Sequence, residues 1–164
     1  MRSLTIGWGL FGVLAVLLDA VVRLAPIALE ALTSGLIWTE WAFALGWTAG
    51  MAFFEGYQGF HKRFAPVVVA RAWHLGAHGR WWQILLAPLF CMGFFHGSRA
   101  RLARSWLLSL GIVALVLGIR AMPQPWRGLI DAGVVVGLSW GSLSILVHAA
   151  RASQGLLVDP QLPS

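Results

Sequence analysis

Charged side chains are the scarcest feature of this 164-residue chain. Asp, Glu, Lys and Arg make up 11% of the residues, whereas about 25% is typical of soluble domains. Hydrophobic residues make up 59%. A soluble protein of this composition would expose large apolar patches, and a disordered chain would hold more charge and fewer aromatic side chains. The composition therefore predicts an integral membrane protein, and the length predicts one domain.

Cysteine and acidic residues are rare as well. A single cysteine, Cys91, excludes a disulfide within the chain. Six acidic residues stand against twelve basic ones, which gives a formal net charge of +6. The bases flank apolar segments, so topology and anionic lipid headgroups explain them and no nucleic-acid partner is predicted. The sequence also lacks a P-loop, a Rossmann glycine pattern and a Cys-x-x-Cys motif.

Long apolar runs predict the spanning helices, because a helix needs about 20 apolar residues to cross the hydrocarbon core. The predicted spans are residues 4–25, 36–56, 105–121 and 129–150. The first resembles a secretory signal but lacks a small-x-small cleavage site, so we expect an uncleaved helix that ends near Pro26. Residues 1–152 are predicted to form one membrane-embedded bundle, and residues 153–164 a loose tail.

The central region, residues 64–98, allows two topologies. If it dips into the membrane or lies at the interface, four spans leave nine basic residues on one side and two on the other. If residues 81–97 cross, five spans divide the bases seven to four. The positive-inside rule favours the first division. We therefore predict an all-α integral membrane fold with four transmembrane helices and a central membrane-dipping or interfacial helical hairpin, with five transmembrane helices as the alternative. The expected location is a bacterial-type inner membrane, with both termini and the basic loops in the cytoplasm.

Small residues recur at intervals of four and predict helix-packing stripes. Such stripes let helix backbones approach closely in a bilayer, either between chains in an oligomer or within one bundle. The predicted packing residues are Ala42, Gly46, Gly50, Gly93, Gly97, Gly133, Gly137 and Gly141.

Ionisable residues near the predicted non-cytoplasmic face form a second candidate feature. Asp19 and Arg23, and likewise Arg127 and Asp131, are spaced i,i+4, so each pair can meet on one helix face. Two interpretations are open: a polar vestibule for a small solute, or charge pairing at the membrane interface. The predicted polar outer-face cluster is Asp19, Arg23, Glu40, Arg120, Arg127 and Asp131.

The histidines fall toward the basic side of the predicted topology. Imidazole and carboxylate groups ligate haem iron or other metals, which predicts a candidate metal site; the alternative is histidines at the headgroup level. Its members are Glu55, His61, His96 and His148. Basic side chains predicted to contact lipid headgroups are Lys62, Arg63, Arg99, Arg101 and Arg104.

These features predict a non-enzymatic, helix-packed bundle in the lipid bilayer. The expected role is a subunit of a membrane complex, as a homo-oligomer or with other chains, or a component of small-solute transport. The alternative is a haem- or metal-dependent membrane enzyme that uses the cytoplasmic-side histidines. Neither the small-residue stripes nor the histidines identify a substrate or a cofactor.

Overall fold

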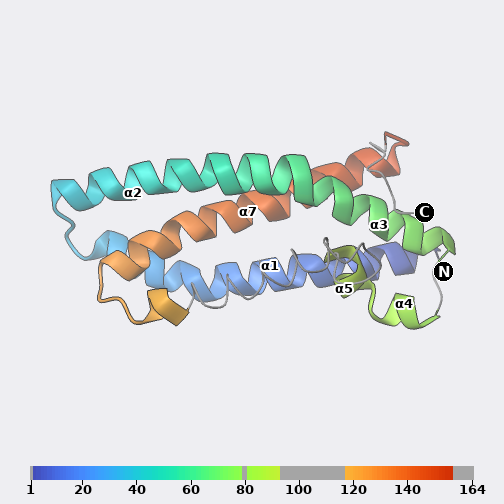
Figure 1. Ribbon diagram of the computed structural model, residues 1–164, viewed down its shortest axis with the longest axis horizontal. Coiled ribbons are helices and arrows are strands. Elements are labelled where there is room, and N and C mark those ends of the chain that lie inside the picture. The colour runs from blue at the N-terminus through green and yellow to red at the C-terminus, as the bar shows by residue number, and fades with distance from the viewer. Residues whose placement is uncertain (1, 79–80, 93–116, 157–164) are drawn as a thin grey trace.

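The computed structural model describes residues 2–78, 81–92 and 117–156, and throughout these ranges the regular secondary structure is helical. The all-α class is therefore confirmed. Three long helical rods run beside one another along the molecule, and two short helices lie against one end of them (Figure 1). The elements are α1 (Arg2–Thr33), α2 (Trp38–Met51), η1 (Ala52–Phe64), α3 (Ala65–His78), α4 (Trp81–Leu85), α5 (Ala87–Met92) and α7 (Trp126–Ser153).

Helix α1 continues past the predicted end at Pro26 and stops at Thr33. A proline removes one backbone donor from a helix, but the turns beyond Pro26 are held by packing, since Ala31 is only 1% exposed. The Ser34 hydroxyl donates to the carbonyl of Ala31 at 2.7 Å and satisfies part of the helix end. Gly35 follows with φ +82°, a left-handed conformation that suits glycine after a helix. The predicted boundary was wrong because these contacts outweigh one missing hydrogen bond.

The second rod is a single continuous helix from Trp38 to His78, formed by α2, η1 and α3. The residues at its two internal junctions, Ala52 and Ala65, have right-handed helical dihedral angles, so the chain does not turn there. Glu40 begins the rod by accepting the backbone N–H of Ile37 at 3.0 Å. The predicted span at residues 36–56 is thus the first part of a longer helix, and residues 65–78, expected at the interface, continue it.

Helix α1 runs opposite to the second rod, and α7 runs parallel to that rod and packs between the two (Figure 1). The N-terminus and the end of α7 therefore lie at the same end of the molecule. The main core is formed there by side chains of α1, α3 and α7 that are at most 7% exposed, among them Val13, Leu17, Val68, Val69 and Ile145. A smaller cluster of Ala31, Ala44 and Leu129 closes the opposite end.

The short helices α4 and α5 belong to the predicted central hairpin, and α5 packs against α1 and α3. Arg71 of α3 is 6% exposed and donates to the carbonyl of Phe90 at 3.0 Å. Cys91 is also buried, and burial raises the pKa of its thiol to about 12, which keeps the thiol neutral. Arg71, counted from the sequence among the headgroup-side bases, instead joins α3 to α5.

Two of the described helices are long and apolar enough to cross a membrane: Ser3–Thr33 and Trp126–Ser153. They contain the first and last predicted spans. The predicted four-span count is not confirmed. Residues 36–56 are the first part of the second rod, and the third predicted span, 105–121, falls mostly outside the described residues.

Candidate functional site

The glycines of α7 form a groove that receives side chains from the second rod. A Cβ added at Gly133 would lie 2.5 Å from Nε1 of Trp47. The same substitution at Gly141 would bring a Cβ to 2.6 Å from the ring of Phe60, and at Gly137 to 3.4 Å from Glu55. Contacts this short need glycine at Gly133 and Gly141. We call this contact line the α7 seam; it consists of Gly133, Gly137 and Gly141 with Trp47, Met51, Glu55 and Phe60.

Trp47, which packs over Gly133 in the α7 seam, is also held by a hydrogen bond. Its indole Nε1 donates to the carbonyl of Ile130 at 3.1 Å, across the two rods. Trp47 is 36% exposed, but its indole N–H lies against α7 and finds a backbone partner there. Packing over Gly133 and donation to Ile130 together orient the ring.

The π-helical geometry of η1 keeps the two rods in register. Glu55 and Phe60 are five residues apart, and the glycines that they contact, Gly137 and Gly141, are four apart. A π-helix advances more residues per turn than an α-helix, with i→i+5 bonds, so a five-residue step on η1 matches a four-residue step on α7. Gly56 allows the reverse contact, since its own Cβ would lie 3.0 Å from Trp140.

The small residues of α2 have a different environment. An added Cβ at Gly46 or Gly50 meets no atom within 4 Å in the described part of the chain, and Ala42 is exposed. Gly46 is exposed and Gly50 is half-buried, and no described side chain fills the space beside either glycine. Gly93 and Gly97, the other predicted packing residues, lie outside the described ranges.

Two predicted metal ligands, His61 and His148, meet beyond the end of the α7 seam. Their rings are 4.9 Å apart between centroids and cross at 65°. Ser144 contacts both: its hydroxyl lies 3.2 Å from Nδ1 of His61, and its carbonyl accepts from Nδ1 of His148 at 2.8 Å. Ser144 is 2% exposed, so it is a fixed anchor for two half-buried rings. We call these three residues the histidine pair and its anchor.

Basic and aromatic side chains surround the histidine pair. Tyr57 stacks on His61 with ring centroids 5.8 Å apart, and the ammonium group of Lys62 lies 4.6 Å above the Tyr57 ring. Desolvation lowers the pKa of His61, and the charges of His148, Arg151 and Lys62 lower it further. All of these neighbouring charges are positive, so His61 tends to be neutral near pH 7.

The lowered pKa of His61 predicts a pH dependence of stability. The unfolded chain binds the His61 proton more tightly than the folded chain, so the free energy of unfolding is expected to fall as the pH drops through the ordinary histidine pKa of about 6.5. Unfolding of the wild-type protein and of His61→Gln, followed by tryptophan fluorescence from pH 8 to pH 5, measures this slope. The variant is expected to show a shallower slope; an equal slope in both proteins contradicts the prediction.

The remaining predicted metal ligands do not join the histidine pair. Glu55 lies against Gly137 within the α7 seam, and His96 is outside the described residues. Within the described ranges, no three side chains of His, Cys, Asp or Glu come together as metal ligands. The four-residue metal site therefore stays a prediction.

The polar outer-face cluster resolves into separate pairs. Arg23 Nε and Asp19 contact each other at 2.8 Å on the exposed surface of α1. Arg127 Nε and Asp131 are 3.8 Å apart on α7, where Asp131 is only 5% exposed. No ion pair among the described residues links these pairs or includes Glu40, which caps α2.

Of the predicted headgroup contacts, Lys62 and Arg63 are exposed at the end of η1, and Arg120 of the outer-face cluster is exposed just before α7. Arg99, Arg101 and Arg104 lie outside the described ranges.

The residues that sequence reasoning missed are Ser144 and Tyr57. Both were accessible to a simple rule, because each stands four residues before a histidine and so shares its helix face.

No family model, curated protein or solved structure matches this chain. Its class is defined by the fold of the described residues, whose regular secondary structure is helical and includes two helices that are long and apolar enough to cross a membrane.

Proposed function

We propose that the chain is a multi-pass inner-membrane protein with a non-enzymatic role, as a subunit that assembles in the bilayer through the outer face of α2. The observation that carries the proposal is the contrast between its two glycine stripes. Gly133, Gly137 and Gly141 contact side chains of the same chain, whereas a Cβ added at Gly46 or Gly50 has no described atom within 4 Å.

An outward stripe of small residues on a membrane helix favours a protein neighbour. Lipid tails are as apolar as leucine, so helices associate there by close packing, and small residues allow that packing. Large exposed apolar residues stand before and after the stripe, among them Trp38, Phe53 and Phe54. The partner surface is either a second copy of this chain or a helix of another subunit.

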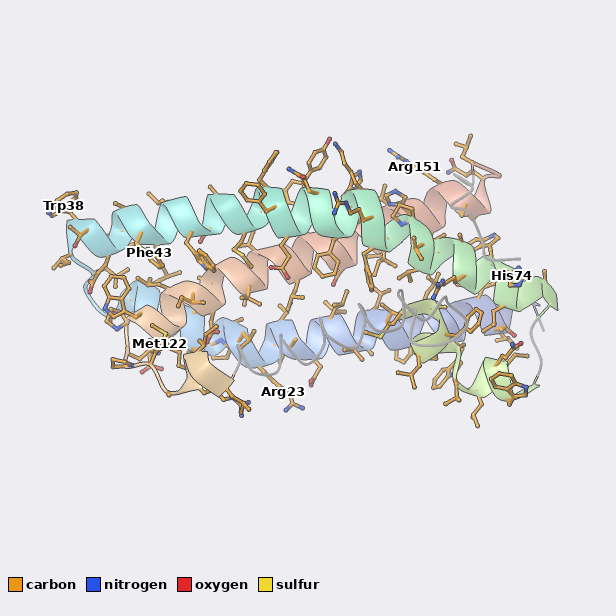
Figure 2. All side chains as sticks on the ribbon, viewed as in Figure 1. Arg23, Trp38, Phe43, His74, Met122 and Arg151 are labelled. Carbon is orange, nitrogen blue, oxygen red and sulfur yellow. The ribbon has the colours of Figure 1, made fainter. Side chains whose placement is uncertain are left out.

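The orientation follows from the basic residues. Lys62, Arg63 and Arg151 all lie toward the end of the molecule that holds the N-terminus, as Figure 2 shows for Arg151. The positive-inside rule places this end in the cytoplasm. Trp38 marks the opposite end, where an aromatic ring suits the headgroup level (Figure 2).

Leucine substitutions test the assembly. Gly46→Leu with Gly50→Leu is expected to shift the protein from an oligomer or complex to a monomer, because the side chains hold the helices apart. Gly7→Leu is the matched control, since a Cβ added at Gly7 of α1 also has no described atom within 4 Å. Mass in mild detergent, by light scattering, and crosslinking in native membranes measure the change. A monomeric wild-type protein without crosslinked partners, or an unchanged mass in the double variant, contradicts the proposal.

A second candidate role, small-solute or proton transport, rests on acidic side chains inside the bundle. Glu55 lies between the second rod and α7, and Asp131 is 5% exposed. Ionisable residues within spanning helices mark ion or proton pathways in many membrane proteins. Proton flux into proteoliposomes that is abolished by Glu55→Gln supports this role, and flux equal to that of empty liposomes rejects it.

A further inference from the structure

The histidine pair and its anchor hold two imidazole rings in fixed positions. The Ser144 carbonyl accepts from Nδ1 of His148, which assigns the proton to Nδ1 and leaves Nε2 without one in the neutral ring. The Ser144 hydroxyl forms a hydrogen bond with Nδ1 of His61. In the described part of the chain, Nε2 of neither ring makes a hydrogen bond. Both rings therefore have one nitrogen available for a ligand.

The charges around these nitrogens select the kind of ligand. The Lys62 ammonium lies 4.6 Å above the Tyr57 ring, which stacks on His61 with ring centroids 5.8 Å apart. Arg151 stands three residues after His148 on α7 and so shares its helix face. No Asp, Glu or Cys side chain joins the two histidines within the described ranges, since no group of three such residues occurs there. A divalent cation would meet two positive charges and no carboxylate, which weakens its binding. An anion gains from the same charges.

We propose that His61, His148, Lys62 and Arg151 form a binding site for a phosphate group at the basic end of the bundle. Lysine and arginine donate charge-assisted hydrogen bonds to phosphate oxygens, and a histidine that takes up a proton from water beside the anion becomes a further donor. Lys62 and Arg151 are exposed and the rings are half-buried, so the site opens outward. The phosphate comes from an anionic phospholipid headgroup or from a soluble phosphate.

The lipid source rests on the membrane placement in the proposed function, but not on assembly through α2. Basic side chains near an anionic leaflet contribute about 1 kcal/mol each, or about fivefold in affinity. Two features distinguish this site from scattered surface charge. The histidines are in ring contact, and a buried serine fixes both of them.

Thermal unfolding of the purified full-length protein tests the site. Wild-type protein is titrated in mild detergent with phosphatidylglycerol, phosphatidylcholine, inorganic phosphate or zinc chloride. We expect phosphatidylglycerol to raise the midpoint more than phosphatidylcholine does. Arg151→Gln is expected to raise the half-saturating phosphatidylglycerol concentration about fivefold. The double variant His61→Gln with Arg151→Gln is expected to raise it further. Arg23→Gln is the matched control, because Arg23 is an exposed arginine on α1 (Figure 2).

The four titrations distinguish a lipid, a soluble phosphate and a metal as the ligand. A rise with inorganic phosphate that His61→Gln removes supports the site and assigns a soluble source; a rise with phosphatidylglycerol alone supports it and assigns the lipid. Equal effects of both lipids without a phosphate effect, or equal losses in Arg151→Gln and Arg23→Gln, overturn the proposal. Stabilisation by zinc but by no phosphate compound overturns it in favour of a metal. None of these readouts depends on Gly46 or Gly50, so failure of the assembly proposal is seen separately.

Discussion

Gly128→Val is expected to lower the free energy of unfolding by about 3 kcal/mol, the upper part of the range for overpacking a tight contact. Gly128 is buried where the first turn of α7 crosses α1. An added Cβ would overlap the methyl group of Ala31 and lie 2.5 Å from the carbonyl oxygen of Ile27. A backbone carbonyl and an alanine methyl have no rotamer into which they can move, so the helices must separate.

Gly7→Val is the matched control for Gly128→Val, because Gly7 of α1 lies outside the proposed assembly face of α2. Both substitutions replace a helical glycine and gain the same helix propensity, about 0.5 kcal/mol, but an added Cβ at Gly7 has no described atom within 4 Å. Thermal unfolding in mild detergent, followed by tryptophan fluorescence, compares the two variants. If Gly128→Val does not accumulate, Gly128→Ala gives a smaller loss. Equal midpoints for the matched variants would contradict the close crossing of α1 and α7.

The α7 glycines show what the spacing of small residues can and cannot predict about helix packing. The spacing of Gly133, Gly137 and Gly141 predicts that one face of this helix packs closely, but Gly46 and Gly50 have the same spacing. The two stripes differ in what lies opposite them. Trp47 and Phe60 fill the groove of α7 from a segment that is distant in sequence. A local pattern contains no information about that partner, so the spacing alone could not tell which stripe packs within the chain.

Helix ends were harder to predict than helices. Pro26 is a helix breaker by local rules, yet α1 continues because Ala31 packs beyond it. The second predicted span stopped at residue 56, whereas η1 continues that helix as a π-helix. Its register depends on matching α7, which is a tertiary requirement. The pairing of His61 with His148 likewise depends on that register, although the Ser144–His148 contact follows from i,i+4 spacing alone.

Ile145→Ala is expected to lower the free energy of unfolding by about 2 kcal/mol, the low end of the range for removing a core isoleucine. Ile145 is 0% exposed and packs in the main core with Val13, Leu17 and Val68. In water the cost has a transfer part and a cavity part. In a bilayer the transfer part shrinks, because lipid tails are as apolar as the protein interior, and the lost contacts remain as the main cost.

Leu143→Ala is the control, since Leu143 is 60% exposed two residues earlier on the same helix. Because the side chain is exposed, its truncation removes few protein contacts, so the free energy of unfolding is expected to stay within about 0.5 kcal/mol of wild type. Reversible unfolding in mixed micelles measures both variants on one scale. A loss for Leu143→Ala as large as that for Ile145→Ala means that this face of α7 is covered by protein, and the proposed assembly then involves α7 as well as α2.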